Sequence, residues 1–409
     1  MTHHPDSPPL TADAPSPDPE RSEPPPGTPG TPGVGRLIGL DLARGLAVFG
    51  MYAVHVGPAP GQGGVIGFLM ELAQGRSSAL FAVLAGFAVA LITGRRTPKT
   101  GVAGRQAVAK VVIRAAILLA LGTALTLTGT PVVPILAFYG LFFLLVLPLY
   151  RLGAKPLALI AVGWALVGPQ LLYALKPVFG GRVFLSYGQA DGPVSLFFTG
   201  GYPALTWVPF VIAGMAVARC DLAATSVRIR LALTGVALAI TGYGGSWLAV
   251  RLIPGAAEAV RKAEQGPGTS SVASMSSVSP DSIGIFGDTP AGMLASAPHS
   301  EATLSIVAAT GVAILVITAC LAATDAFPRL RRLAGPVIAV GSMSLTAYVY
   351  HIAAIWLLDP ETSAVPPLHI LLGFIASVTV LATLWSRFFQ RGPLEWLMGG
   401  ATELAHRIR

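Results

Sequence analysis

Residues 36–57 read RLIGLDLARGLAVFGMYAVHVG, an apolar stretch long enough to cross a bilayer that also contains Asp41, Arg44 and His55. Successive helical residues are about 100° and about 1.5 Å apart, so Arg44 and His55 lie within roughly 20° of each other and roughly 16 Å apart along the axis. Asp41 lies about 40° from His55, on the same side. Ionisable side chains are costly inside a membrane, so we interpret this polar stripe as part of a functional site.

The composition fixes the broad class. Of the 409 residues, 53% are hydrophobic and only 11% are charged, which excludes a soluble globular protein. We predict an all-α polytopic membrane protein whose partner is the lipid bilayer. The two cysteines, Cys220 and Cys320, have no metal-binding spacing, so we expect packing roles for them and no metal site.

Apolar segments recur along the chain, and about 20 such residues are needed to cross the hydrocarbon core. They predict about ten transmembrane helices. The expected spans are 37–56, 77–94, 111–129, 132–150, 156–175, 201–219, 231–252, 302–323, 335–357 and 367–387.

The orientation follows from the basic residues, because Lys and Arg concentrate in cytoplasmic connections. With the N-terminus inside, 20 of the 27 Lys and Arg residues fall on the cytoplasmic side and 6 on the outer side, while Arg44 lies within the membrane. We therefore predict cytoplasmic N- and C-termini in a multi-pass protein of the plasma membrane. This distribution also accounts for the net charge of +8 without a nucleic-acid partner.

The chain divides into three parts. Residues 1–35 are rich in Pro, Ser, Asp and Gly and predict a disordered cytoplasmic tail. Residues 36–400 form the transmembrane domain, with a Gly-, Ser- and Pro-rich outer loop at 253–300 that we expect to be mostly irregular. Residues 401–409 are a second cytoplasmic tail.

Four histidines are predicted on the outer half of the membrane domain: His55, His299, His351 and His369. Imidazole exchanges protons near neutral pH, which suits a general base. The alternative is that such histidines anchor helix ends or hydrogen-bond to loops. The stripe shared with Arg44 makes His55 the strongest candidate for chemistry.

A second polar face is predicted in GSMSLTAYVYH, where Ser344, Tyr348 and His351 follow helical spacings of four and three. These residues would line the same cavity as His55, although small residues on such a face also serve close helix packing. Arg76, at the start of GRSSALFAVLAGF, would either reach harmlessly to the membrane interface or contact an acidic or sugar-like group.

Several sequence motifs in this chain, including those above, resemble the motifs of a known protein superfamily. RLIGLDLARGLAVFGMYAVH resembles the opening of the transmembrane acyltransferase superfamily, which includes the heparan-α-glucosaminide N-acetyltransferase relatives, the YeiB-type bacterial membrane proteins and the acyltransferase-three family. The spacing from Arg44 to His55 is similar to the first-helix motif of the last group. GRSSALFAVLAGF, APHSEAT, GSMSLTAYVYH and RGPLEWLMGG resemble the YeiB-type pattern, so the similarity covers most of residues 36–400.

The resemblance implies an enzyme that takes an acetyl or other acyl group from cytoplasmic acyl-CoA and delivers it to an outer acceptor, a glycan or a small molecule with a hydroxyl or amine. Arg44 and Asp41 would serve the donor side, and His55 would be the base. The heparan enzyme has asparagine at the position of His55 and its catalytic histidine in the next outer segment, whereas residues 56–76 contain none. His55 takes that role, or His299 does, or this branch has lost acyl transfer.

Two other function classes stay open. A proton-coupled transporter or exporter of small molecules would also use a polar stripe, with Asp41 and His55 as its protonatable groups. Asp41 is the only acidic residue that we place well inside a span, which counts against a proton relay. The third class is a non-catalytic membrane protein of the cell envelope.

Overall fold

All the regular secondary structure in the described residues is helical, and no strand occurs in those residues. The computed structural model describes residues 37–130, 132–179, 192–264, 290–358 and 368–408. The predicted all-α class is confirmed for this part of the chain. The predicted tail at 1–35 lies outside the described residues.

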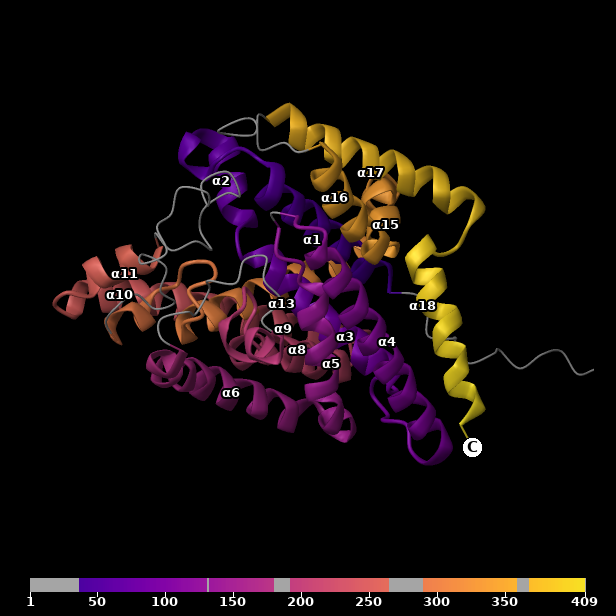
Figure 1. The fold of residues 1–409 in the computed structure, drawn as a ribbon, viewed down its shortest axis with the longest axis horizontal. Helices are drawn as coiled ribbons and strands as arrows, with labels where there is room; N and C mark the ends of the chain where they lie inside the picture. Colours follow the sequence, from indigo (N-terminus) through magenta and orange to yellow (C-terminus); the bar gives the residue numbers. More distant parts are fainter. Residues whose placement is uncertain (1–36, 131, 180–191, 265–289, 359–367, 409) are drawn as a thin grey trace, which may run out of the picture. The chain divides into compact units, whose positions relative to one another are not determined.

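The helices carry the labels of Figure 1. The first group is α1 (Ile38–Val56), α2 (Gly64–Ala73), α3 (Arg76–Ile92), α4 (Gly101–Leu127), α5 (Leu136–Val146), α6 (Ala154–Leu175), α7 (Gly192–Val194) and α8 (Ala204–Arg219). The second group is α9 (Thr225–Ala239), α10 (Gly245–Leu252), α11 (Ala256–Glu264), α13 (Thr303–Ala326), α14 (Pro328–Leu333), α15 (Gly335–Ser342), α16 (Ser344–Leu358), α17 (Leu368–Phe388) and α18 (Pro393–Glu403).

Several helices are long and apolar enough to cross a membrane. Among the described residues there are 6, or up to 8 if each of two bent pairs forms one span. The six are Gly64–Ile92, Gly101–Leu127, Ala154–Leu175, Thr225–Leu252, Thr303–Ala326 and Leu368–Phe388. Helices α1 and α5 cover the predicted spans 37–56 and 132–150 but are not in this set, so ten spans remain a prediction.

The predicted ninth span is not one straight helix. Helices α15 and α16 meet at Met343 with a bend of 86°. The carboxylate of Glu395, on α18, accepts hydrogen bonds from the backbone N–H groups of Leu345 (2.7 Å) and Thr346 (3.2 Å) and from the Thr346 hydroxyl (2.6 Å). The first N–H groups of a helix have no partner within it, so Glu395 stabilises the start of α16 from a distant part of the chain.

Helix α1 packs against α15, α13 and α3. Its crossing with α15 is close because each helix contributes a glycine. A Cβ at Gly45 would overlap the backbone carbonyl of Val337, and a Cβ at Gly341 would overlap that of Asp41. Small residues allow such approach between membrane helices, and the contact fixes the part of α1 that carries Asp41 and Arg44.

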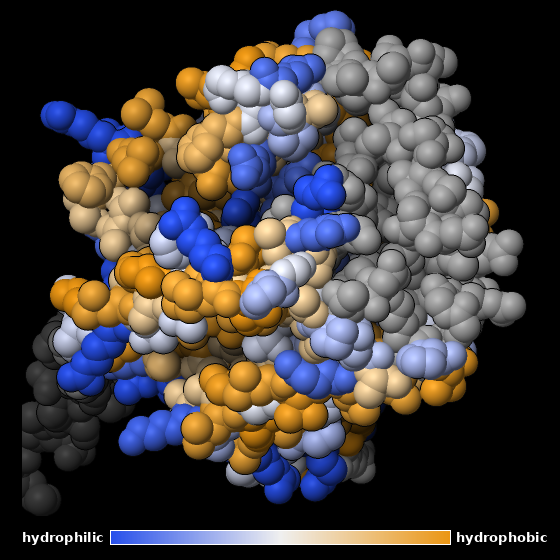
Figure 2. Space-filling model, turned by 90° about the vertical axis from the view of Figure 1, so that its left-hand side faces the viewer, coloured by the Kyte–Doolittle hydropathy of each residue, from blue (hydrophilic) through white to orange (hydrophobic). Residues whose placement is uncertain are grey.

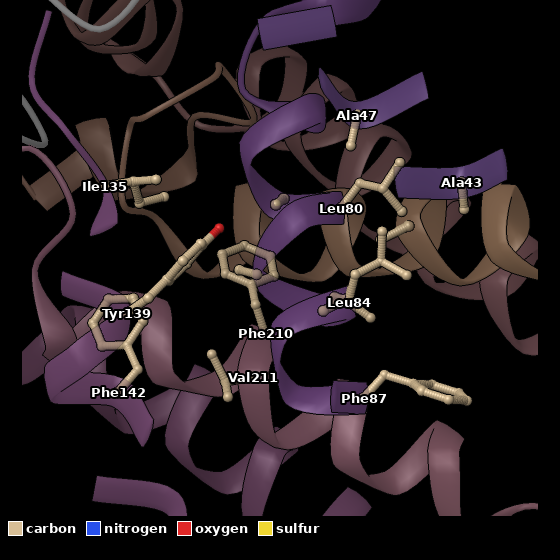
Figure 3. Close-up of a cluster of buried hydrophobic side chains, with 14 of the residues drawn as sticks. Ala43, Ala47, Leu80, Leu84, Phe87, Ile135, Tyr139, Phe142, Phe210 and Val211 are labelled. Carbon is tan, nitrogen blue, oxygen red and sulfur yellow. The ribbon is translucent and has the colours of Figure 1, made fainter. Parts of the chain in front are cut away.

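Helices α3 and α8 cross in the same way, with Gly86 against the carbonyl of Val211 and Gly214 against that of Val83. Around this crossing lies a core of large apolar side chains. Figure 3 shows side chains of α1 and α3 in one cluster with Tyr139 of α5 and Phe210 of α8. The core therefore joins the helix of the polar stripe to the middle of the chain.

Five of these helices were not predicted: α2, which continues into α3 in the candidate span Gly64–Ile92; α7, between the spans 156–175 and 201–219; α11, within the loop 253–300; and α14 and α18, which follow spans. A short 3-10 helix, Pro290–Leu294, also lies in that loop. These elements are too short to give a membrane-span signal.

Candidate functional site

The polar stripe of α1 begins with an ion pair. Nη1 of Arg44 donates to Oδ1 of Asp41 at 3.0 Å, and the Arg44 side chain is 23% exposed whereas that of Asp41 is 5% exposed. One helical turn separates the two residues, so the pairing follows from the local spacing. The carboxylate holds the guanidinium at one position while leaving part of it accessible.

Arg44 faces a cavity of about 230 Å³, which we call the Arg44 cavity. Residues from seven helices contribute to its wall, among them Arg44, Arg114, Tyr139, Ser344, Tyr348 and Glu395. Arg44 and Arg114 bring two guanidinium groups to a wall that also carries the Glu395 carboxyl. Guanidinium groups form strong paired hydrogen bonds with phosphate and carboxylate oxygens, so the cavity is suited to an anionic group.

The Tyr139 hydroxyl lies on this cavity without a partner. Tyr139 is 3% exposed, and its oxygen makes no hydrogen bond within the described residues. Figure 3 shows this oxygen among hydrophobic side chains that include Phe210. Nearly all buried polar groups in proteins find a partner, so this hydroxyl is available to hydrogen-bond.

The other end of α1 carries a histidine pair. Nδ1 of His55 lies 3.0 Å from Nε2 of His351, and the two rings are stacked, 5° from parallel with centroids 5.2 Å apart. His351 is fully buried against the rings of Tyr52 and Tyr348, whereas His55 is partly exposed. The partly exposed histidine is thus supported by a buried one.

This geometry suits a general base. When the Nδ1 of neutral His55 carries the proton, it donates to the lone pair of His351 Nε2, and the Nε2 of His55 is free to accept a proton. The same hydrogen bond then stabilises the imidazolium that forms. The 3.0 Å distance fits donation in either direction, and the tautomer described is the one that a base at Nε2 of His55 requires.

A second cavity, which we call the Glu301 pocket, has a volume of about 30 Å³. Its lining includes Gln74, Arg76, Trp207, Tyr243, His299 and Glu301. Figure 2 views the molecule from the side of α2, α10 and α11, and shows hydrophilic side chains around a hollow in a largely hydrophobic surface.

Arg76 is held at the edge of the Glu301 pocket by two hydrogen bonds. Its Nε donates to the Tyr243 hydroxyl at 2.7 Å, and its Nη1 donates to the carbonyl of Glu71 at 2.6 Å. The guanidinium carbon also lies 5.2 Å from the centroid of the Tyr243 ring. These contacts orient the positive charge and leave Arg76 partly exposed.

The segment that carries His299 and Glu301 is strained. Both residues have positive φ, 54° and 57°, which is unusual for residues other than glycine. His299 packs its ring against Trp207 and Tyr202, with centroids 5.6 Å away in each case. Packing therefore holds this backbone in place.

Burial governs the protonation of both side chains, which lie just before α13. Burial raises the pKa of the Glu301 carboxyl to about 7, while hydrogen bonds from Thr206 and Trp207 act to lower it. Burial lowers the pKa of His299 to about 4. Near neutral pH, His299 is thus uncharged and Glu301 exchanges a proton.

The structure divides the predicted site residues among three places. Arg44, Ser344 and Tyr348 line the Arg44 cavity, and Asp41 pairs with Arg44. His55 and His351 contact each other and line neither of the two cavities. Arg76 and His299 line the Glu301 pocket.

Sequence reasoning missed Arg114, Tyr139, Glu301 and Glu395. Arg114 counts among the cytoplasmic basic residues although it falls within the expected span 111–129, and α4 brings it to the cavity. Tyr139 stands in an apolar segment without a polar periodicity. For Glu395, the RGPLEW motif was a signal, but a local pattern does not reveal which helix start a carboxylate will reach.

No group of three or more His, Cys, Asp or Glu side chains suited to a metal ion occurs among the residues with described positions. The long apolar helices define a multi-pass membrane protein. Residues 36–249 match the family described as heparan-alpha-glucosaminide N-acetyltransferase, catalytic, and residues 289–404 match the family described as protein of unknown function (DUF418).

The first match covers more than half of the chain, and the chain belongs to this membrane acetyltransferase-like family. The two matches confirm the resemblance read from the sequence motifs. A search of curated proteins finds no match to the chain.

Proposed function

We propose that the protein is a membrane acyltransferase that moves an acetyl or other acyl group from acyl-CoA to a hydroxyl or amine acceptor across the membrane. One observation carries this proposal. Helix α1 holds Arg44 at a cavity lined by two guanidinium groups and, eleven residues further on, His55 in contact with the buried His351. A phosphate-binding group and a base thus share one helix, roughly 16 Å apart.

The Arg44 cavity is the proposed donor end. Arg44 and Arg114 would bind phosphate oxygens of the donor, and the unpartnered Tyr139 hydroxyl would hydrogen-bond to it. A cavity of about 230 Å³ holds one part of a molecule as long as acyl-CoA. Asp41 positions Arg44 for this contact.

The histidine pair is the proposed acceptor end. His55 takes the proton from the acceptor hydroxyl or amine as that atom bonds to the acyl carbon, and the CoA thiolate leaves. His351 accepts the hydrogen bond from His55 Nδ1 and so favours the imidazolium. His299 has its pKa lowered by burial and supports His55 as a neutral neighbour.

The proposed acyltransferase also requires a particular arrangement of the chain in the membrane. Ten spans with both termini in the cytoplasm place Arg44 near the cytoplasm and His55 near the outer face of a plasma membrane. Helix α1 has 19 residues and is therefore about 28 Å long, close to the thickness of the hydrocarbon core. The excess of Lys and Arg in the inner connections supports this orientation.

A proton-coupled transporter is the second candidate, and one observation favours it. Glu301 is 3% exposed and adds a buried carboxyl immediately before the predicted span 302–323. Transport would require Glu301 to take up and release protons while its pocket opens to each side in turn.

The test is acyl transfer by the purified full-length chain in lipid nanodiscs, with labelled acetyl-CoA and a cell-envelope extract as the source of acceptor. We expect label on an acceptor, and we expect His55→Asn to lower the rate by about 100-fold or more. His369→Asn, at an exposed position on α17, is the matched control and should retain the rate. Equal labelling by the wild type and His55→Asn would remove His55 from the chemistry, and no labelling by the wild type would favour transport or an envelope role.

A further inference from the structure

The Glu301 carboxyl is buried and is surrounded by neutral hydrogen-bond donors. Trp207 Nε1 donates to Oε1 at 2.9 Å, and the Thr206 hydroxyl contacts Oε2. No ion pair of Glu301 occurs among the described residues. A buried carboxylate without a cationic partner is expensive, so this environment favours a carboxyl that can hold a proton.

The hydrogen bonds around Glu301 can be completed in either protonation state. The Thr206 hydroxyl has one hydrogen and lies within hydrogen-bond distance of two acceptors, Glu301 Oε2 and the Pro203 carbonyl at 3.2 Å. In the protonated state, Oε2–H donates to Thr206 and Thr206 donates to Pro203. In the ionised state Thr206 donates to Glu301, and the Pro203 carbonyl still accepts the backbone N–H groups of Thr206 and Trp207, each at 3.0 Å. Both states can exist without rearrangement of the backbone.

The charge of the Glu301 pocket therefore depends on one proton. Arg76 is positively charged and oriented by Tyr243, and His299 is neutral near pH 7. Two further titratable groups belong to these surroundings. Tyr202 interacts electrostatically with Glu301, and His55 interacts electrostatically with His299. With Glu301 ionised, its charge offsets that of Arg76. With Glu301 protonated, Arg76 remains as an uncompensated cation.

We infer that the Glu301 pocket is a proton-linked binding site for a carboxylate group, in which Glu301 takes up one proton from water as the ligand carboxylate binds beside Arg76. Two carboxylates in a confined site cannot both stay ionised at low cost. Arg76 balances the charge of the ligand, and Glu301 becomes neutral. Bond order and oxidation state are unchanged, because the only transfer is that of a proton from water.

The size of the Glu301 pocket limits the ligand. A volume of about 30 Å³ admits one small polar group and not a whole metabolite. A carboxylate is the simplest such group that has the charge to pair with Arg76. This site lies apart from the Arg44 cavity, and the inference does not depend on acyl transfer.

The experiment measures binding of sodium acetate to the full-length chain in nanodiscs, with no acyl donor present. Acetate binding is followed by the rise in the thermal unfolding temperature, and sodium chloride at equal ionic strength and neutral acetamide serve as reference solutes. With the pKa of Glu301 about 7, its protonated fraction falls about tenfold between pH 6 and pH 8. The apparent affinity for acetate should therefore be about tenfold higher at pH 6.

Two variants separate the contributions. Glu301→Gln keeps an acceptor for Trp207 and mimics the neutral carboxyl, so acetate should bind equally well at the two pH values. Arg76→Gln should abolish the rise in unfolding temperature caused by acetate at both pH values. Glu403→Gln, an exposed acid-to-amide change on α18, should behave as the wild type.

A second measurement uses the wild type alone. Addition of acetate at pH 7.5 should remove protons from a weakly buffered solution, which an indicator dye detects. Acetate binding without proton uptake, or a pH dependence that persists in Glu301→Gln, overturns the inference, as does acetate stabilisation no larger than that by chloride. None of these results bears on acyl transfer, so the two proposals fail separately.

Discussion

Nδ1 of His55 lies 3.0 Å from Nε2 of His351, although 296 positions separate the two residues in the chain. The contact joins α1 to α16, and α16 begins only because the predicted ninth span bends at Met343. His55, which the sequence pattern places at the end of a polar stripe, therefore forms a pair with His351 in the fold. The first prediction concerns this pair.

Replacing His351 should lower the turnover number for acyl transfer without weakening donor binding. His351→Phe fills the space but removes the acceptor for His55 Nδ1–H, and we expect a loss of about tenfold, the effect of one net hydrogen bond. His351→Gln retains a hydrogen-bond acceptor and should recover part of that loss. The double variant that combines His351→Phe with His55→Asn should have a turnover number only slightly lower than that of His55→Asn alone. Additive losses in the double variant would show that the two histidines act independently.

Arg44→Gln should raise the Michaelis constant for the acyl donor. The lost charge-assisted hydrogen bond corresponds to about 1.5–3 kcal/mol, or a weakening of roughly 10- to 150-fold. It also leaves Asp41 buried without the cation observed here. Steady-state kinetics with varied acetyl-CoA measures the effect, with Arg230→Gln, at an exposed position on α9, as the control. A changed turnover number with an unchanged Michaelis constant would contradict a donor-binding role.

Gly341→Ala should destabilise the crossing of α1 and α15. The added methyl group would overlap the carbonyl of Asp41, and overpacking of this kind costs about 1–3 kcal/mol. Thermal unfolding in nanodiscs measures the change. Gly373→Ala is the matched control, because Gly373 lies in α17 with open space around it, and alanine there should be neutral or slightly stabilising. Equal unfolding temperatures for the two variants would mean that the close crossing is not important for stability.

The contribution of Glu301 to stability should fall as the pH rises. Its folded-state pKa of about 7 lies above the ordinary value of 4.5, so the native state binds more protons than the unfolded state between these values. The contribution is therefore fully present below pH 4.5 and is lost as the pH rises through 7, with an upper size of about 3 kcal/mol. His299 acts in the opposite direction: its pKa of about 4 makes its contribution rise from about pH 4 to 6.5.

The difference in unfolding temperature between the wild type and Glu301→Gln isolates the Glu301 effect. It should favour the wild type most at pH 4.5 and shrink towards pH 7.5. A difference that is constant across this range, or that grows with pH, would show that Glu301 is ionised throughout. His299→Gln should show the opposite trend against the wild type.

Much of the fold followed from local sequence. Each predicted span contains a described helix, because runs of apolar residues must form helices to satisfy their backbone groups in a membrane. The short helices α2, α14 and α18 were missed because they lack the length of a span. The bend at Met343 was missed because nothing in the local pattern indicates that the Glu395 carboxylate, on α18, accepts the hydrogen bonds of the first residues of α16.

The sequence by itself determined the class of protein, the family and the stripe of Asp41, Arg44 and His55, since composition, motifs and helical periodicity are local properties of the chain. Only the tertiary structure decided which residues meet this stripe. The Arg44 cavity needs α4 and α5 to supply Arg114 and Tyr139, and the histidine pair needs the bent α16. The Glu301 pocket needs a strained segment packed against Trp207. Such contacts arise from how helices cross, and glycines set those crossings at distances that no periodicity in the sequence reveals.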